Sequence, residues 1–214
     1  MVKYRLTKEQ QKLVYATLNC LAEHGYHGTT IRRITANIGT NVSMVQYHFG
    51  GKANLMRSSY RHFRQITQEN YGSLAATTDP DPVRQLETRA RAIFNSRALM
   101  GRKMTRLWIS FLDLVNADPE TAAMRTEIYQ YYVGELADCI NRIPAGQGGK
   151  PSSAEAHRLA VGAYSVIDGL WLEHALNPSG MSPDEAMEIA MELIGARIDV
   201  SISSGHSHPA PAET

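Results

Sequence analysis

Two short helices joined by a tight turn are predicted between Thr29 and Lys52, and they constrain the fold more than any other stretch. The first carries isoleucine at helical spacing, at Ile31, Ile34 and Ile38, which predicts one buried stripe. Gly39 follows and can adopt the positive φ that ends a helix. A second helix is expected from about Asn41 to Phe49. Helices this short and this close cross steeply, which predicts a helix-turn-helix unit.

The remainder of the chain is also predicted to be helical. Thr7 and Gln10 have the spacing of a capping box, so a first helix is expected from about Thr7 to His24, with Gly25 ending it. Further helices are expected at about residues 52–74, 82–98, 102–116, 119–143, 153–176 and 183–201. No strand hairpin is visible, so the expected fold class is all-α, with about nine helices.

The predicted organisation is a small head on a larger body. Residues 1–52 form the three-helix head, residues 53–202 the helical body, and residues 203–214 a disordered tail. The segment TTDPDP, residues 77–82, is a linker inside the body. It is not a full domain boundary, because the helix before it is expected to span head and body.

The last two predicted helices carry more apolar surface than one body can cover. Residues 153–176 are apolar nearly all round, and residues 183–201 have a wide apolar face. A four-helix bundle, with two helices from each subunit, would bury both surfaces. The sequence therefore predicts a homodimer formed through residues 153–176 and 183–201.

Charge is distributed unevenly along the chain. Residues 1–64 hold ten Lys and Arg but only two acids, a net charge of +8, whereas the remainder carries −7. A basic head on an acidic body indicates that the head meets a polyanion. No long apolar run or secretory leader is visible, so no membrane partner and a cytoplasmic location are expected. Cys20 and Cys139 are expected to be buried, reduced thiols.

The segment from residue 7 to residue 55 resembles the DNA-binding head of the TetR family of bacterial regulators. The resemblance rests on GYHGTTIRRITANIG followed by a helix that ends in QYHFGGKANL. In the body, IDGLWLEHAL at residues 167–176 resembles the C-terminal motif of the BetI-type branch, whose named member responds to choline. The resemblance implies a dimeric regulator, most commonly a repressor, that binds a double-stranded DNA operator and responds to a small-molecule inducer.

Two positions depart from the family pattern. Thr40 stands where an apolar residue is usual, and Val42 stands where a polar, DNA-facing residue is usual. Either the second short helix is slightly rotated, so that Val42 is buried with Val45 and Phe49, or Val42 contacts a thymine methyl group. The sequence leaves both alternatives open.

The candidate DNA contacts lie on and around the second short helix. Asn41, Ser43, Met44 and Gln46 are candidates to read base edges, and Asn41 has capping the helix as its alternative role. The resemblance implies phosphate contacts for Tyr47 and His48. Further phosphate contacts are expected at helix starts, from Thr29, Thr30 and Lys52. Arg32 and Arg33 are candidates to join them, and Lys3 and Arg5 are candidates to reach a neighbouring phosphate or the minor groove. The alternative for these four residues is exposure to solvent.

The resemblance also implies a ligand pocket in the body. The candidates are aromatic residues and one carboxylate: Trp108, Phe111, Tyr131, Tyr132, Tyr164, Asp168 and Trp171. Aromatic faces with a carboxylate suit a quaternary ammonium or another organic cation. The alternatives are that the aromatic residues form only core and that Asp168 makes a hydrogen bond across the dimer interface.

Two other classes of protein are alternatives to a DNA-binding regulator. An enzyme is not supported, because no glycine-rich phosphate loop, HExxH motif or nucleophile elbow is visible. No catalytic residue, cofactor or metal site is therefore expected, and His24 and His27 lack a ligand cluster around them. The second alternative is a helical protein–protein adaptor whose basic head binds another acidic partner.

Overall fold

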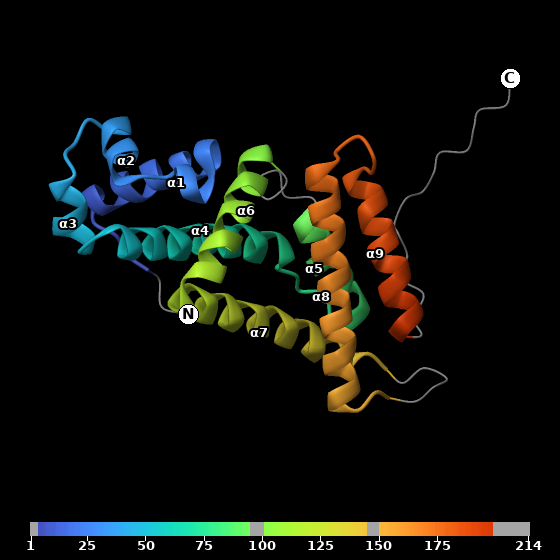
Figure 1. Ribbon diagram of the computed structural model, residues 1–214. Helices are drawn as coiled ribbons and strands as arrows, with labels where there is room; N and C mark the ends of the chain where they lie inside the picture. Colours follow the sequence, from blue (N-terminus) through green and yellow to red (C-terminus); the bar gives the residue numbers. More distant parts are fainter. Residues whose placement is uncertain (1–3, 95–100, 145–149, 199–214) are drawn as a thin grey trace, which may run out of the picture.

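The computed structural model of the chain describes residues 4–94, 101–144 and 150–198. Within these residues it contains nine helices and no strand (Figure 1). The predicted all-α fold is therefore confirmed. The predicted tail at residues 203–214 and the expected helix ends at residues 95–98 and 199–201 lie outside the described part.

Three helices form the head. α1 (Lys8–Gly28) begins at the predicted capping box of Thr7 and Gln10, and it breaks at Gly25, where φ is +69°. α2 (Ile31–Asn37) and α3 (Ser43–Phe49) are the two short helices. Ile34 is fully buried, but Ile38 lies beyond the end of α2 and is 37% exposed. The isoleucine stripe is thus shorter than predicted, because the helix ends one residue too early to turn Ile38 inward.

α4 (Lys52–Ala75) leaves the head and continues into the body, as expected. α6 (Arg102–Ala117) packs across α1 and α4, so Leu107 and Phe111 join Tyr60 and Phe63 in the same core as α1 to α3. In Figure 1 this helix crosses the middle of the molecule. The head therefore shares its hydrophobic core with two helices of the body and is not packed separately from them.

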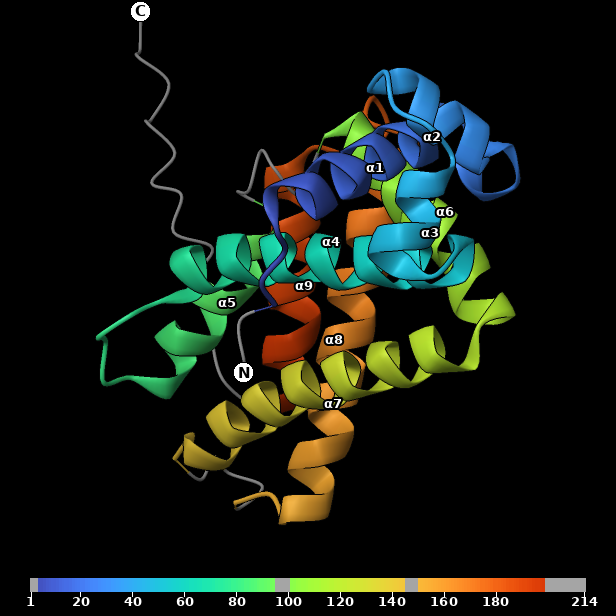
Figure 2. The same cartoon turned by 90° about the vertical axis from the view of Figure 1, so that its left-hand side faces the viewer.

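The other four helices build the body around a second core. They are α5 (Pro82–Phe94), α7 (Pro119–Arg142), α8 (Ser153–Leu176) and α9 (Pro183–Ile198). α7 starts where Asp118 accepts a hydrogen bond from the Thr121 N–H at 2.9 Å, with Pro119 at the first helical position. α8 and α9 pack side by side, and α7 packs across α8 (Figure 2).

Two further observations concern the whole described chain. Cys20 in α1 and Cys139 in α7 are buried free thiols, as predicted. None of the helices among the described residues combines the length and the apolar character needed to cross a bilayer.

Candidate functional site

The first site is the exposed side of α3, which the core holds in place from behind. Val45 is fully buried and Phe49 is 9% exposed, while Met44 packs half-buried against the first core. Gly50 and Gly51 follow with φ of +69° and +137°, a path that residues with a Cβ rarely adopt. The chain therefore returns sharply into α4, and α3 stays at the edge of the head with one face open.

Polar and aromatic side chains occupy that open face. Gln46 is exposed, and the Tyr47 side chain is 82% exposed, with its ring packed edge-on against His48 at 4.9 Å. Val42 is 47% exposed, so it is not buried with Val45 and Phe49. This excludes the first of the two alternatives for Val42 and leaves its methyl groups on the same surface as Gln46.

A side chain caps the first turn of α3. The Asn41 Oδ1 atom accepts a hydrogen bond from the Met44 N–H at 3.2 Å and a second from the Ser43 hydroxyl. Asn41 therefore acts as the cap, the alternative role considered for it. Its amide nitrogen and the exposed Ser43 side chain remain on the surface. Met44 is half-buried, so only part of its side chain lies at the surface.

The two threonines of the turn before α2 differ in exposure. Thr30 is exposed and caps α2, because its hydroxyl accepts a hydrogen bond from the Arg33 N–H at 3.3 Å. Thr29 is fully buried and donates its hydroxyl to the Gly25 carbonyl at 2.7 Å, so that side chain faces the interior. Arg32 is exposed, and Arg33 folds back to donate to the Gly28 carbonyl.

Lys52 begins α4 directly beside α3. Its ammonium group lies 5.8 Å from the centre of the Tyr26 ring, which orients the side chain by a cation–π contact. His48 is half-buried, and its Nε2 atom is buried without a hydrogen-bond partner. Arg5 is exposed, whereas Lys3 lies outside the described residues.

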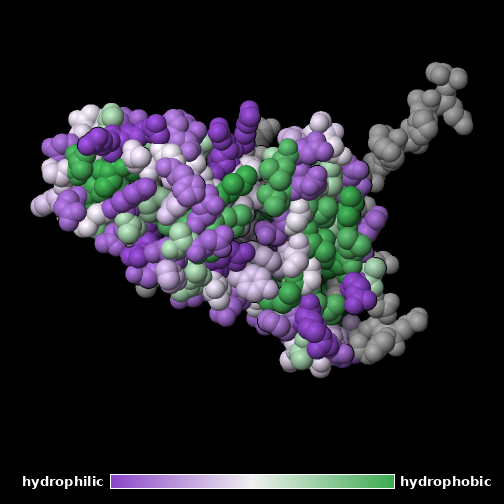
Figure 3. Space-filling model, viewed as in Figure 1, coloured by the Kyte–Doolittle hydropathy of each residue, from purple (hydrophilic) through white to green (hydrophobic). Residues whose placement is uncertain are grey.

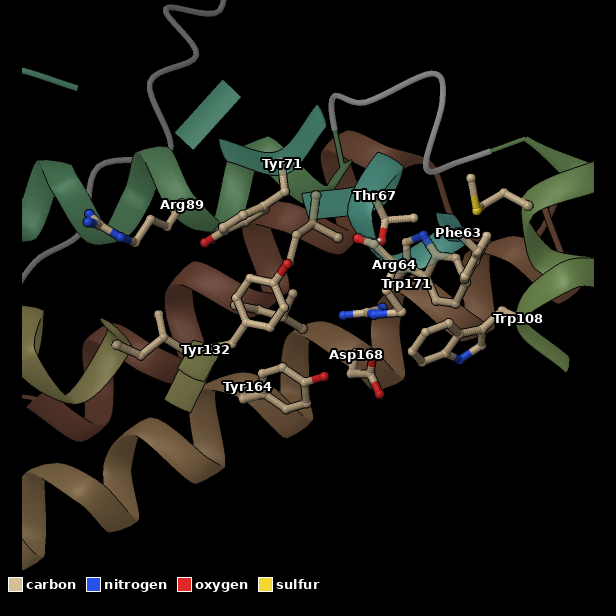
Figure 4. Close-up of a pocket in the computed structure, with 15 residues that line it drawn as sticks. Phe63, Arg64, Thr67, Tyr71, Arg89, Trp108, Tyr132, Tyr164, Asp168 and Trp171 are labelled. Carbon is tan, nitrogen blue, oxygen red and sulfur yellow. Dashed lines mark hydrogen bonds between the residues drawn. The ribbon is translucent and has the colours of Figure 1, made fainter. Parts of the chain in front are cut away.

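The second site is a cavity in the body with an empty volume of about 860 Å³, a figure that includes the open space at its mouth. Helices α4 to α8 all contribute to its wall (Figure 4). Five of the seven predicted ligand residues line it, namely Trp108, Tyr132, Tyr164, Asp168 and Trp171. Phe111 and Tyr131 do not: Phe111 is buried in the first core, and Tyr131 is 55% exposed on α7.

The wall formed by α4 was missed by sequence reasoning. Phe63, Thr67 and Tyr71 line the cavity at spacings of four residues, and Arg64 lies beside them. Such spacing places the three side chains on one face of a helix. The periodicity was visible in the sequence, but nothing there showed that the face would close a cavity against α8.

Charged groups lie together at one end of this cavity. Arg64 is 8% exposed and points into the same region as Asp168, Tyr164 and Trp108 (Figure 4). Burial raises the pKa of the Asp168 carboxyl, while Arg125 and Arg64 act in the opposite direction. Burial also raises the pKa of Tyr132 to about 12, so this phenol stays protonated at neutral pH.

Comparison with known proteins places both sites in one family. Residues 82–199 match the family described as BetI-type transcriptional repressor, C-terminal, and residues 13–58 match bacterial regulatory proteins of the tetR family. The chain belongs to the TetR family of transcriptional regulators, in its BetI-type branch. The segment 13–58 contains α3, and the segment 82–199 contains most of the residues that line the cavity.

Relatives and solved structures agree with this assignment. The regulator BetI 1 of Chromohalobacter salexigens is 26% identical over 198 residues, which cover 91% of this chain and 92% of that protein. A transcriptional regulator of Pseudomonas aeruginosa PAO1 has a similar structure, with a TM-score of 0.80, 26% identity and coverage of 91% and 93% of the two chains. A regulator of Saccharomonospora viridis, solved in complex with choline, superposes with a TM-score of 0.71 at 18% identity, over 88% of this chain and 96% of that one.

The family assignment gives the general function of the chain. Regulators of the TetR family bind DNA operators and act as dimers, and the similar proteins are transcriptional regulators rather than enzymes. The chain is therefore a TetR-family transcriptional regulator with a helix-turn-helix head.

Proposed function

We propose that a homodimer of this chain binds a pseudo-palindromic operator as a repressor and is released when a small molecule enters the cavity. The exposed face of α3 carries the proposal, because it presents Gln46 and Tyr47 outward from a rigidly packed head. One short helix reads only a few base pairs, whereas two related by a two-fold axis read both half-sites. Such a regulator acts in the cytoplasm, where the bacterial chromosome lies.

Side chains on and around α3 divide between base reading and phosphate binding. Gln46 forms a bidentate pair with adenine in this proposal, and Val42 contacts a thymine methyl group. Ser43 and the Asn41 amide lie at the start of the same face, beside Met44. Phosphate contacts come from Tyr47, His48 and Arg32, from Lys52, and from the start of α2 at Thr30.

The dimer interface is assigned to the outer face of α8 and α9. Apolar side chains gather over these two helices (Figure 3), and Leu176 and Leu193 are 59% and 51% exposed. Gly162, Ser165 and Gly169 are exposed on the same face of α8 and follow a helical spacing. Small residues let a partner helix approach closely, so this face suits a bundle of two helices from each subunit.

The cavity is suited to control the heads because α4 belongs to both sites. Its first residue, Lys52, lies beside α3, and its later turns supply Phe63 to Tyr71 of the cavity wall. A ligand changes the affinity for DNA only to the extent that it binds one arrangement of the heads better than another.

The direct test of the proposal is a gel shift with DNA from upstream of the chain's own gene. We expect a shifted band that weakens steeply as salt rises, because phosphate contacts release counterions. Gln46→Ala should weaken the shift while leaving the melting temperature unchanged, since its side chain is exposed. Binding that hardly responds to salt would contradict the DNA-binding proposal.

The interface is tested with two matched glycine substitutions. A Cβ at Gly169 in α8 or at Gly72 in α4 would meet no atom within 4 Å, so arginine fits the isolated subunit at both positions. We expect Gly169→Arg to give a monomer by sedimentation analysis and Gly72→Arg to remain dimeric. A dimeric Gly169→Arg variant would place the interface elsewhere.

A further inference from the structure

Arg64 is a buried charge whose side chain makes no hydrogen bond or ion pair with any residue that the structure describes. It is 8% exposed, and its Nε atom is buried with no acceptor within reach. Burying a guanidinium group without an acceptor is costly, so buried arginines normally pair with an anion. This one points into the cavity (Figure 4), where a bound ligand could supply the acceptor.

Two of the protein's own cations lie against one aromatic ring of the cavity wall. A quaternary ammonium group binds over the faces of aromatic rings. Here the guanidinium groups of Arg64 and Arg125 lie 5.3 and 5.9 Å from the centre of the Trp108 ring, and Arg125 also lies 5.6 Å from the Tyr129 ring. Of these two rings, Trp108 lines the cavity, so an organic cation would compete with the protein's own cations for the faces of that ring.

The charges at this end of the cavity do not balance. Arg64 and Arg125 contribute two positive charges, and Asp168 contributes one negative charge at most, because burial raises its pKa. Among the described residues, the one hydrogen bond of the Arg125 side chain goes to the Tyr164 hydroxyl, at 3.5 Å. The remaining charged residue of the wall, Arg89, pairs with Glu135 at 3.6 Å. A cationic ligand would add a further positive charge, whereas a monoanion would neutralise the excess.

We propose that the ligand of this cavity is an organic monoanion, with a carboxylate paired to Arg64 and an apolar body packed against the aromatic wall. A guanidinium group and a carboxylate can form two parallel hydrogen bonds, which fixes the orientation of the ligand as well as its charge. Trp171, Tyr132 and Phe63 supply the wall for the body of the ligand. This inference rests on the proposed function, in which the cavity is the effector site.

Tryptophan fluorescence tests the charge preference directly. The chain has two tryptophans, Trp108 and Trp171, and both line the cavity, so their emission reports on its occupancy. Three probes of similar shape are titrated: phenylacetate, its neutral amide and benzyltrimethylammonium. We expect a saturable change with phenylacetate at the lowest concentration, and roughly a tenfold or larger loss of that affinity in Arg64→Gln.

Arg61→Gln is the matched control. Arg61 lies on α4 like Arg64, and its substitution removes the same charge, but its side chain is exposed and does not line the cavity. Its affinity for phenylacetate should equal that of the unaltered chain. Arg64→Lys keeps the charge without the planar fork and should bind with intermediate affinity. Circular dichroism and a thermal melt confirm that each variant is folded.

Several results would overturn the proposal. They are tighter binding of benzyltrimethylammonium than of phenylacetate, equal phenylacetate affinity in Arg64→Gln and Arg61→Gln, or no saturable change with phenylacetate in the folded chain. Loss of the cation signal in Asp168→Asn would then identify Asp168 as the anchor of a cationic ligand. The titration contains no DNA, so a failure to bind the operator leaves its outcome unaffected, and the two proposals fail separately.

Discussion

Removing the Lys52 ammonium group should change how operator binding depends on salt by an amount that the structure allows us to work out. Lys52 is the first residue of α4, beside the exposed face of α3, and its ammonium group is oriented over the Tyr26 ring at 5.8 Å. Each phosphate contact contributes about 0.9 to the slope of log affinity against log salt. A symmetric dimer loses one contact in each head, so Lys52→Gln should reduce the slope by about 1.8.

This difference is large enough to measure by fluorescence anisotropy with a labelled operator. When salt rises from about 50 to about 200 mM, the affinity of the unaltered chain should fall about twelvefold further than that of Lys52→Gln. Arg84→Gln is the control, because it removes one exposed charge per subunit from α5 in the body. Equal slopes for the Lys52 variant and the unaltered chain would refute the phosphate contact, and an equal change in Arg84→Gln would show only an effect of net charge.

The remaining predictions concern the support of α3 and the junction of α4 with α7. Phe49→Ala should lower the free energy of unfolding by about 3 kcal/mol, seen as a lower melting temperature, because it empties a buried site behind α3. Tyr47→Ala, at an 82% exposed position, should leave the melt unchanged and weaken operator binding in a gel shift. The Arg57 guanidinium, helped by Thr121, holds the pKa of Asp118 well below its ordinary 3.8. A carboxylate with a depressed pKa stabilises the fold above its unfolded pKa, and this contribution is lost as pH falls through the folded pKa. The melting temperature of Asp118→Asn should therefore fall less steeply than that of the unaltered chain as the pH drops below about 4. Parallel curves of melting temperature against pH for the two proteins would contradict this.

The parts of the fold that could be predicted from the sequence are those set by local interactions. The capping box at Thr7 and the break at Gly25 fix the ends of the first helix within a few residues. The pair Asp118 and Pro119 likewise fixes the start of α7. Such signals depend on neighbours along the chain, so one sequence suffices to find them.

The cavity could be predicted only in part, because helical spacing does not show which neighbour a side chain faces. Trp108 and Phe111 are three residues apart in α6, yet Trp108 lines the cavity and Phe111 packs into the first core. Tyr131 and Tyr132 are adjacent, and adjacent residues of a helix point about 100° apart, so only one of them can face inward. Which of the two faces inward depends on how α7 packs, and that is a property of the assembled body.

The shared core of the head decides how a ligand could act on DNA binding. Because α1 to α3 pack with α4 and α6 around one core, a ligand in the cavity cannot move α3 relative to α1 without opening that core. The head must instead turn as one unit relative to α8 and α9.

Arg57 lies between the two sites on α4, and its Nε and terminal nitrogen donate to both oxygens of Asp118 at 3.0 and 2.7 Å, which connects this helix to the start of α7. Lys52 and Arg64 lie on opposite sides of this Arg57–Asp118 contact, roughly 18 Å apart along α4. A ligand that draws Arg64 into the cavity would therefore tilt α4 about Arg57 and shift Lys52, with the rest of the head, in the opposite direction. For such a tilt to weaken operator binding a hundredfold, the ligand must favour the tilted form by about 2.7 kcal/mol, which is within the range of one charged pair of hydrogen bonds to a buried guanidinium group.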